Sequence, residues 1–335
     1  MTIISYIAAI LLFCVMIAIH EFGHFATAKL FGIKVNEFSI GMGPLLLHTQ
    51  KGETEYSVRA LPIGGFCAIE GEDGEGDDER SFGRKPWWQR IIVLAAGAFM
   101  NILLCFVILI SVLTFAGQTS QTLSSVVEGS PAWEAGIRGG DRITAVNHVE
   151  YDSWAEVVNA INASEGKELV LTGVKDGIAT DYVCTPVLSE SGRYVVGINA
   201  GVEHNAGNAF KATITIMKSY STAMFDWLNT LVHGQASRDD VAGVVGIVSM
   251  TAEQAKMGLV SILFFMAMIS LNLGIVNLLP VPALDGGRIL FVIIRTLSGG
   301  RLSAEAEGLI HGAGMVLLMG LMVFLAINDV SHLIN

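Results

Sequence analysis

Residues 3–28 read IISYIAAILLFCVMIAIHEFGHFATA, an apolar run that carries a cluster of ionisable residues near its end. A membrane-spanning helix needs about 20 mostly apolar residues, so this run is long enough to cross a bilayer. A secretory signal peptide would have a basic start and a small-residue cleavage site, and the run has neither. We therefore predict a first transmembrane helix that holds polar groups at membrane depth.

The rest of the chain is apolar in the same way. It has 335 residues, of which 52% are hydrophobic and only 15% charged, and its mean hydropathy is +0.57. A soluble protein of this length can bury only one core, so the excess predicts further membrane spans. Three more runs have the required length: 91–116, 258–297 and 308–328.

The charge distribution excludes one class of function. The net charge is −11, and many of the acids concentrate in the stretch EGEDGEGDDE at 70–79. Lysines and arginines form no face of the kind that nucleic-acid binding requires. We therefore expect no nucleic-acid partner.

Basic residues near the ends of the spans predict the orientation, because cytoplasmic connections close to a membrane are enriched in them. Here they fall in the first and third connections: Lys29, Lys34, Arg84, Lys85, Arg90, Arg295 and Arg301. We expect a multi-pass protein of the bacterial cytoplasmic membrane with both termini extracytoplasmic. The long connection at 117–257 would then also be extracytoplasmic.

Two regions between the spans predict β-structure. Alternation at 56–61 predicts strands, with a tight turn at the Gly64–Gly65 pair, while Met42 and Pro44 predict a loop that dips into the membrane. Residues 122–200 alternate β-branched runs with turns and contain one helical stretch, Ser153 to Ala163, which predicts a small water-soluble α+β domain.

The predicted fold class is a polytopic α-helical membrane protein with about four transmembrane helices, a membrane-associated β-hairpin region and one extracytoplasmic α+β domain. The segments expected along the chain are a first helix (1–32), a cytoplasmic-side re-entrant hairpin region (33–90), a second helix (91–116), the extracytoplasmic domain (117–204), an amphipathic surface helix with a linker (205–257), a broken third span (258–300) and a fourth helix with a tail (301–335).

The third span contains an anomaly. Within NLGIVNLLPVPALDGGRIL, Pro280 and Pro282 lie close together and are followed by the Gly286–Gly287 pair. Two prolines this close prevent a regular helix. Unwound backbone at membrane depth is tolerated only where protein buries it or where it lines a wet cavity. We therefore predict a functional site at this break.

The motif HEFGH at 20–24 has the pattern HExxH. Residues four apart lie on the same face of a helix, so His20 and His24 can present two imidazoles to one metal ion. Glu21 would then lie beside a metal-bound water and could accept its proton. A chance match is the alternative. Ionisable residues inside a membrane are costly, however, so three within five positions favour a zinc site.

A third ligand must come from another part of the chain. Asp285 is the only acid between Glu253 and Glu305, and it lies in the broken span, where a carboxylate needs a partner. The alternative is that it caps the helix that follows, and the two roles are compatible. Of the amides nearby, Asn277 could bind a substrate backbone, and Asn272 is expected to join helices. His311 in the last span could also form a hydrogen bond across helices.

Several motifs together resemble the site-2 protease family, in particular the bacterial RseP-like regulated intramembrane metalloproteases. The matching motifs are HEFGH (20–24), FSIGMGP (38–44), PIGGF (62–66), EGE (70–72), AAGAFMN (95–101) and NLLPVPALDGG (277–287). The stretch VVEGSPAWEAGIRGGDRITAVN at 126–147 is similar to one PDZ domain of the permuted bacterial type. The chain departs from the family pattern at Ala98 and Val244, where proline is usual, and at Cys67-Ala68, where Val-Lys is usual.

The resemblance implies a role for each matching residue. His20, His24 and Asp285 would bind Zn²⁺, and Glu21 would be the general base. Asn101 would support the core. Substrate would be held by the hairpin, as an added strand, and by one amide of the broken span: Gly64, Gly65, Phe66 and Asn277.

The expected function is therefore that of an intramembrane zinc endopeptidase. Its substrates would be single-span membrane proteins that an upstream site-1-type protease has already trimmed, such as anti-sigma factors or signal-peptide remnants. Two other functions remain open: a membrane adaptor without enzymatic activity, and a transporter that uses the broken span as a cation site. An adaptor would need neither Glu21 nor Asp285. A transporter should show internal repeats, and the sequence shows none.

Overall fold

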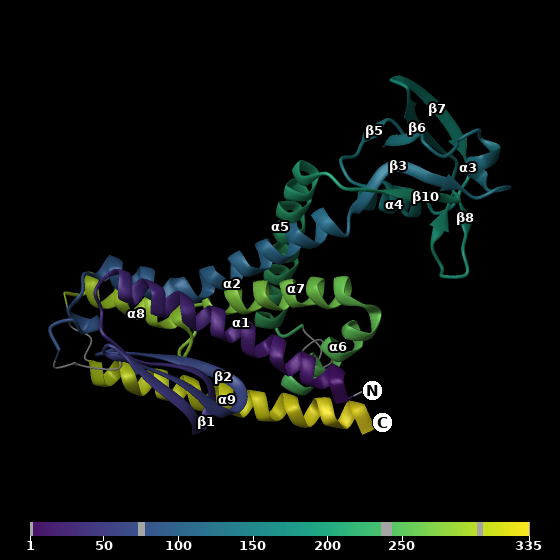
Figure 1. The fold of residues 1–335 in the computed structure, drawn as a ribbon. Coiled ribbons are helices and arrows are strands. Elements are labelled where there is room, and N and C mark those ends of the chain that lie inside the picture. Colours follow the sequence, from purple (N-terminus) through teal and green to yellow (C-terminus); the bar gives the residue numbers. More distant parts are fainter. Residues whose placement is uncertain (1–2, 73–77, 236–242, 300–303, 335) are drawn as a thin grey trace. The chain divides into compact units, whose positions relative to one another are not determined.

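The computed structural model describes residues 3–72, 78–235, 243–299 and 304–334 (Figure 1). The chain divides into two compact units, one of Met1–Val112 with Ala212–Asn335 and the other of Leu113–Lys211. The first unit holds the long apolar helices, and the second is built mainly of strands. Residues 1–2, Arg301, residues 73–77 of the acidic stretch and residue 335 lie outside the described residues.

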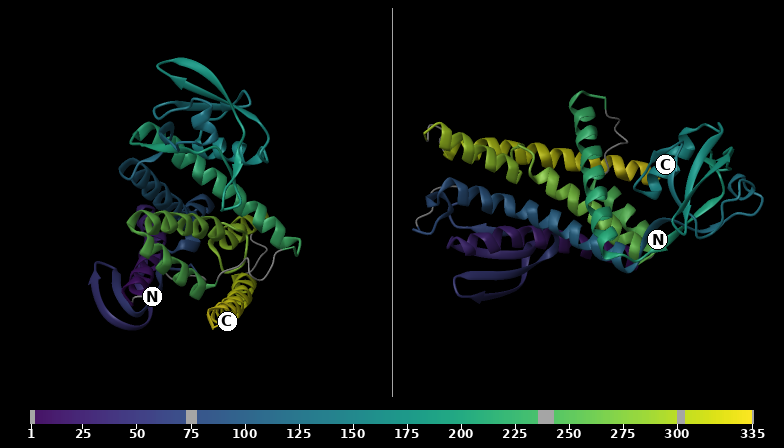
Figure 2. Two further views of the ribbon diagram at one scale, coloured as in Figure 1. Left: turned by 90° about the vertical axis from the view of Figure 1, so that its right-hand side faces the viewer. Right: turned by 90° about the horizontal axis from the view of Figure 1, so that it is seen from above.

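Four helices among the described residues are long and apolar enough to cross a membrane, as the sequence predicts. They are α1 (Ile3–Leu30), α2 (Trp87–Phe115), α7 (Leu259–Asn277) and α9 (Ala304–Ile334). Figures 1 and 2 show that their axes are roughly parallel, with the chain direction alternating from one helix to the next. One apolar core joins α2 to α7 through Leu109 and Leu271. Another core packs the end of α1 against the start of α2 through Ala28 and Val93.

The predicted break in the third span is confirmed. Helix α7 ends at Asn277, and α8 (Asp285–Leu297) begins after the linker 278–284, which contains both prolines. The linker folds back tightly over the first turn of α8. A Cβ at Gly287 would lie 2.8 Å from the carbonyl carbon of Val281, so only glycine permits this approach. The Gly286–Gly287 pair therefore serves the close packing of the linker.

Strands β1 (Val35–Lys51) and β2 (Thr54–Ile69) form a long antiparallel hairpin, drawn in purple and blue in Figure 1. Lys51 pairs with Thr54 across a turn at Gly52, whose φ is +67°. The prediction of a turn at Gly64–Gly65 is wrong, because both residues lie inside β2. Glycine is needed there for a different reason: Gly64 has φ +97° within an irregular strand.

The part of this hairpin formed by residues 40–47 and Leu61 is apolar and exposed. The predicted loop at Met42 and Pro44 is instead part of β1. Side chains here include a set of apolar residues that are 40–70% exposed: Ile40, Met42, Leu45, Leu46, Leu47 and Leu61. On α1, the thiol of Cys14 donates to the carbonyl oxygen of Pro62 at 2.7 Å. The hairpin therefore runs back along α1 as far as its middle.

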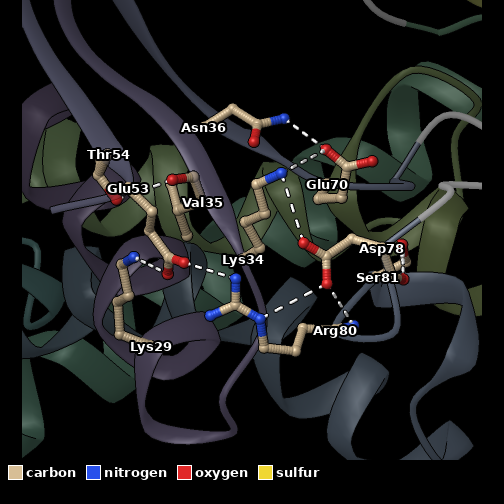
Figure 3. A network of polar contacts seen from close by, with 10 residues as sticks. All are labelled: Lys29, Lys34, Val35, Asn36, Glu53, Thr54, Glu70, Asp78, Arg80 and Ser81. Carbon is tan, nitrogen blue, oxygen red and sulfur yellow. Dashed lines mark hydrogen bonds and ion pairs between the residues drawn. The ribbon is translucent and has the colours of Figure 1, made fainter.

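The turn of the hairpin and the start of β1 are fixed by a polar network, shown in Figure 3. Glu53 in the turn accepts from Lys29 at the end of α1, at 2.8 Å, and from Arg80, at 2.6 Å. Thr54 donates its hydroxyl to the carbonyl oxygen of Val35 at 2.7 Å. The turn is thus tied both to α1 and to the segment that precedes the short 3₁₀ helix η1 (Phe82–Arg84).

Two further helices complete the first unit. Helix α5 (Ala206–Val232) was expected to place its apolar face on the membrane surface, but Met217 and Met224 of that face pack against the α2–α7 core. Asn272 of α7 donates to the hydroxyl of Tyr220 at 3.1 Å, so it joins helices as predicted. Helix α6 (Val244–Met257) is capped from α9: Asp329 accepts from the backbone N–H of Gly243 and Gly246 at 3.1 and 2.8 Å.

The second unit is an α+β domain. Its main sheet has the strand order β10-β3-β4-β6-β7 with β5 beside β4, and β8 pairs with β9 separately. The elements are β3 (Gln118–Val126), α3 (Pro131–Glu134), β4 (Arg142–Val146), β5 (Val149–Glu150), α4 (Trp154–Ala163), β6 (Leu169–Lys175), β7 (Ile178–Cys184), β8 (Val187–Leu188), β9 (Tyr194–Val195) and β10 (Ile198–Glu203).

The predicted helix of this domain is confirmed as α4. Ser153 is its N-cap and forms a capping box with Glu156. Val157 and Ile161 are buried in the domain core with Ile143 and Leu171. The last strand, β10, lies beside the first, β3, so the chain enters and leaves this domain at neighbouring positions.

Candidate metal centre

Helix α1 carries the HExxH motif and aligns its two histidines. The rings of His20 and His24 meet edge to face with centroids 4.9 Å apart, and their Nε2 atoms are 3.2 Å apart. Both residues are buried, with 7% and 8% of their surface exposed. The i, i+4 spacing thus brings two imidazole nitrogens to one point, as the sequence predicts.

Asp285 reaches the same point from the other side of the broken span. Its Oδ2 lies 3.2 Å from Nε2 of His20 and 3.5 Å from Nε2 of His24. It is the first residue of α8, where Leu284 takes the N-cap position and no side chain caps the helix. The carboxylate is therefore directed at the histidines and does not act as a helix cap.

The distances among these three atoms test whether a zinc ion fits. A tetrahedral zinc with ligand bonds of about 2.0–2.1 Å places its ligands about 3.3–3.4 Å from one another. The three atoms are separated by 3.2, 3.2 and 3.5 Å. Two imidazoles and a carboxylate are also a usual donor set for catalytic zinc, with one position left for water. The residues therefore fit the ion.

The protonation of His24 supports the same assignment. Its Nδ1 lies 2.8 Å from the backbone carbonyl oxygen of Val93 on α2. A carbonyl oxygen only accepts, so Nδ1 carries a proton, and whenever the ring is neutral its Nε2 is bare. This nitrogen faces the carboxylate of Asp285, which when ionised also only accepts. Two such atoms at 3.5 Å repel unless a cation, proton or metal, lies between them.

Asn101 occupies the equivalent position beside His20. Its side-chain amide lies 3.2 Å from Nδ1 of His20, and the residue is completely buried. As placed, Nδ2 faces the ring, and Oδ1 has no hydrogen-bond partner in the described part of the chain. A half-turn of the amide would let Oδ1 accept from Nδ1–H and leave Nε2 bare for a metal. Asn101 can therefore orient His20 as Val93 orients His24.

Gly97 provides the space that the two rings occupy. A Cβ at this position would lie 2.8 Å from Nε2 of His20 and even closer to Nε2 of His24. Val93, Gly97 and Asn101 are spaced four apart, so they share one face of α2. A second contact is equally close, because a Cβ at Gly23 of α1 would meet the carbonyl of Ala96 at 2.6 Å. This face of α2 therefore packs closely against the face of α1 that carries the two histidines.

Glu21 lies between the two histidines and strand β2. Its carboxylate lies near the backbone N–H of Cys67. A Cβ built on Gly65 would lie 3.6 Å from Cγ of Glu21. The hairpin therefore runs directly past this carboxylate.

The other residues predicted to bind substrate take different positions. Gly64 faces Met42, since a Cβ there would lie 3.0 Å from Sδ. The ring of Phe66 lies under the guanidinium of Arg59, 5.2 Å from its centre. Asn277 is the last residue of α7, where the linker to Asp285 starts. Of these predicted residues, the structure places Gly65 against Glu21.

One ion pair joins the hairpin to the helix that carries Asp285. Arg288 of α8 pairs with Glu72, just beyond the end of β2. Glu72 belongs to the acidic stretch at 70–79, so the first part of that stretch has a partner.

Sequence reasoning missed three contributors to the site. They are the carbonyl of Val93, the missing side chain of Gly97 and the backbone N–H of Cys67. Two are backbone groups, which leave no mark on residue type. Gly97 left a signal, since it lies four residues before Asn101 in the run AAGAFMN and both therefore fall on one helix face.

Comparison with known proteins gives a consistent result. The model of the family described as Peptidase family M50 matches residues 8–321. A Clostridium perfringens protein is 38% identical over 97% of this chain and 98% of its own length. The zinc metalloprotease RasP of Bacillus licheniformis is 31% identical, over 98% and 99%. The regulator of sigma-W protease RasP of Bacillus subtilis is 31% identical, over 98% of both chains.

Solved structures match part of the chain with low TM-scores. The PDZ domain of an SdrC-like protein from Listeria monocytogenes is 18% identical and covers 24% of this chain and 84% of its own, with a TM-score of 0.22. Its counterpart from Listeria innocua is 21% identical and covers 26% and 100%, with a TM-score of 0.23.

Proposed function

This chain belongs to peptidase family M50, and from that premise we propose that it is an intramembrane zinc endopeptidase that cuts transmembrane segments of single-span proteins. One observation carries the proposal. Three ligand atoms from His20, His24 and Asp285 lie within 4.8 Å of one another, with two of the ligands on a helix long and apolar enough to span a membrane. An adaptor would have no use for this geometry.

The residues divide the chemistry among them. His20, His24 and Asp285 would hold the ion, which when bound lowers the pKa of a water ligand and polarises a peptide carbonyl. Glu21 takes the proton from the attacking water and delivers it to the leaving amine. The backbone N–H of Cys67 lies near the Glu21 carboxylate. Val93 and Asn101 hold the two rings in the orientation that the ion requires.

The hairpin gives the substrate a binding edge. A peptide bond in a helix is shielded, so the substrate must unwind, and its freed N–H and C=O groups then need partners. Strand β2 passes Glu21 at Gly65 and Cys67, so a chain paired along Gly64, Gly65 and Phe66 would lie beside the general base. Asn277 would hold the substrate backbone from the broken span.

The substrates are proposed to be membrane proteins trimmed beforehand by an upstream site-1-type protease, such as anti-sigma factors or signal-peptide remnants. The Bacillus subtilis relative is named as a regulator of sigma-W, and this supports the first class. We place the protein in the bacterial cytoplasmic membrane with both termini extracytoplasmic, and we assign residues 117–204 to an extracytoplasmic PDZ-type domain. The distribution of basic residues around the spans supports this orientation.

The Glu21→Gln variant tests the proposal. The ligands remain while the base is lost, so zinc should stay equimolar with protein and peptide-bond cleavage should fall by about 100-fold or more. Metal analysis of the purified protein and an assay on a single-span model substrate measure the two quantities. Glu128→Gln, at an exposed position of the second unit, is the matched control and should cleave like the wild type. Undiminished cleavage by the Glu21 variant would contradict the role of this residue.

A further inference from the structure

The linker before Asp285 contains a strained residue. Ala283 has φ +75°, in the left-handed region that a residue with a side chain rarely adopts. Such a conformation costs free energy and persists only where neighbouring structure enforces it. Ala283 lies two residues before Asp285. A change of φ here would swing the carboxylate away from His20 and His24.

The group that enforces this conformation comes from α9. The backbone N–H of Ala283 donates to Nδ1 of His311 at 2.9 Å. In a linker without regular structure this N–H has no helical acceptor, and leaving it unpaired at membrane depth would be costly. His311 thus supplies an acceptor that fits the strained conformation of Ala283.

His311 is itself held in place. Its ring meets the ring of Phe291 on α8 edge to face, with centroids 5.0 Å apart. Three residues further along α9, a Cβ at Gly314 would lie 2.6 Å from Cβ of Pro282. His311 and Gly314 share one face of the helix, so α9 rests directly on the Pro282–Ala283 peptide.

This contact stands out on a helix with little other burial. In the apolar stretch of α9 no residue is buried inside the protein, whereas 44% of the corresponding residues of α7 are buried. The contact with the linker is therefore a local one, made where the chain turns toward the ligand carboxylate.

We infer that His311 is a positioning residue for Asp285: it holds the strained Ala283 peptide so that the carboxylate meets the two histidines. The inference rests on the proposed function in one respect, that Asp285 binds zinc. It gives the last span a part in the metal centre although it supplies no ligand. The role requires only a hydrogen-bond acceptor at the position of Nδ1.

The test compares replacements that keep or remove this acceptor. His311→Leu should lower zinc affinity about 10- to 100-fold, the range found when a partner of a metal ligand is removed. His311→Asn carries an oxygen close to the position of Nδ1 and should stay within a few-fold of the wild type. His311→Gln places its oxygen near Nε2 and should resemble the leucine variant. Zinc affinity is measured by competition with a chelator, alongside kcat and KM.

A second-site change separates positioning from simple packing. Glycine adopts φ +75° without strain, so Ala283→Gly in the His311→Leu background should recover much of the lost zinc affinity. If His311 only fills space, the added glycine will recover nothing and the asparagine variant will be as weak as the leucine one. Either result overturns the inference, as does unchanged zinc affinity in His311→Leu.

Controls distinguish this outcome from failure of the proposed function. Val316→Ala, at a position of α9 that is 72% exposed, should bind zinc like the wild type. Thermal unfolding of the metal-free proteins shows whether a variant has lost its fold. If His311→Leu does not fold, the Ala283→Gly variant serves as the background instead, and adding His311→Gln to it should change zinc affinity little. A wild-type protein that binds no zinc would refute the proposed function. A zinc-binding wild type matched by all His311 variants would refute only the inference.

Discussion

At the scale of single residues, the two histidines of the motif depend on positions about 70 to 80 residues away. Val93 and Asn101 contact the ring nitrogens that face away from the proposed ion. Gly97 between them leaves the room that the rings fill. Mutation of supporting partners of this kind commonly lowers metal affinity about 10- to 100-fold. The site therefore extends well beyond its HExxH motif.

Gly97→Ala is the sharpest test at this scale. The new methyl group would overlap His24 and lie 2.8 Å from Nε2 of His20, so the rings must move off the ligand positions. We expect zinc affinity to fall by about 10-fold or more, with a parallel loss of cleavage. Gly320→Ala is the matched control, because a Cβ there meets nothing within 4 Å. Normal zinc affinity in Gly97→Ala would show that the rings are placed in some other way.

At the scale of elements, the hairpin contacts the rest of its unit at three places. Pro62 contacts Cys14 of α1, Cys67 lies near Glu21, and the turn is tied to Lys29 through Glu53. Hydrogen bonds from Lys29 and Arg80 hold the pKa of Glu53 below its usual value. In the proposed mechanism this strand passes the general base and pairs with the substrate chain, so its register must be fixed.

The network at the turn should therefore respond to pH. Because the folded pKa of Glu53 is depressed, its stabilising contribution is present above the unfolded pKa of about 4.3 and is lost as pH falls through the lower folded value. Glu53→Gln should unfold at a lower temperature than the wild type at pH 7, and the difference should shrink at about pH 3. The exposed neighbour Glu79→Gln serves as control. A difference that stays constant with pH would mean that the charge of Glu53 is not involved.

At the scale of the whole molecule, a separate α+β domain is inserted between two membrane helices. Its first and last strands pair, with Ser120 opposite Gly201. A compact domain attached in this way can exclude substrates whose external part is large. It can also recruit substrates by binding a newly exposed chain end. We favour exclusion, because an obstruction needs no specific affinity.

Deletion of residues 122–200 distinguishes the two roles. The cut joins Gln121 to Gly201, two positions that already lie at paired strands, so the remaining chain should still fold and bind zinc. With exclusion, the deletion should permit cleavage of full-length, untrimmed substrates. With recruitment, it should slow the cleavage of trimmed ones. Cleavage rates of both substrate forms are compared at equal zinc content. Unchanged rates on both forms would rule out both roles.

Features that depend on local pattern could be predicted from the residues alone. Apolar length predicted four spans, helical spacing brought His20 and His24 together, and the two prolines predicted the break before Asp285. These are properties of neighbouring residues, so they survive without knowledge of the fold. The same local reasoning failed at Gly64–Gly65, because a glycine pair serves a turn or an irregular strand equally well and only the pairing partners decide.

Which distant groups meet depends on how the folded chain packs. The carbonyl of Val93 and the N–H of Cys67 are backbone groups that every residue type carries, so no sequence pattern marks them. The contact of His311 with Ala283 joins α9 to the linker before Asp285 and depends on how the helices pack. A residue type states which chemistry is available, whereas chain packing determines the few ångströms over which that chemistry acts.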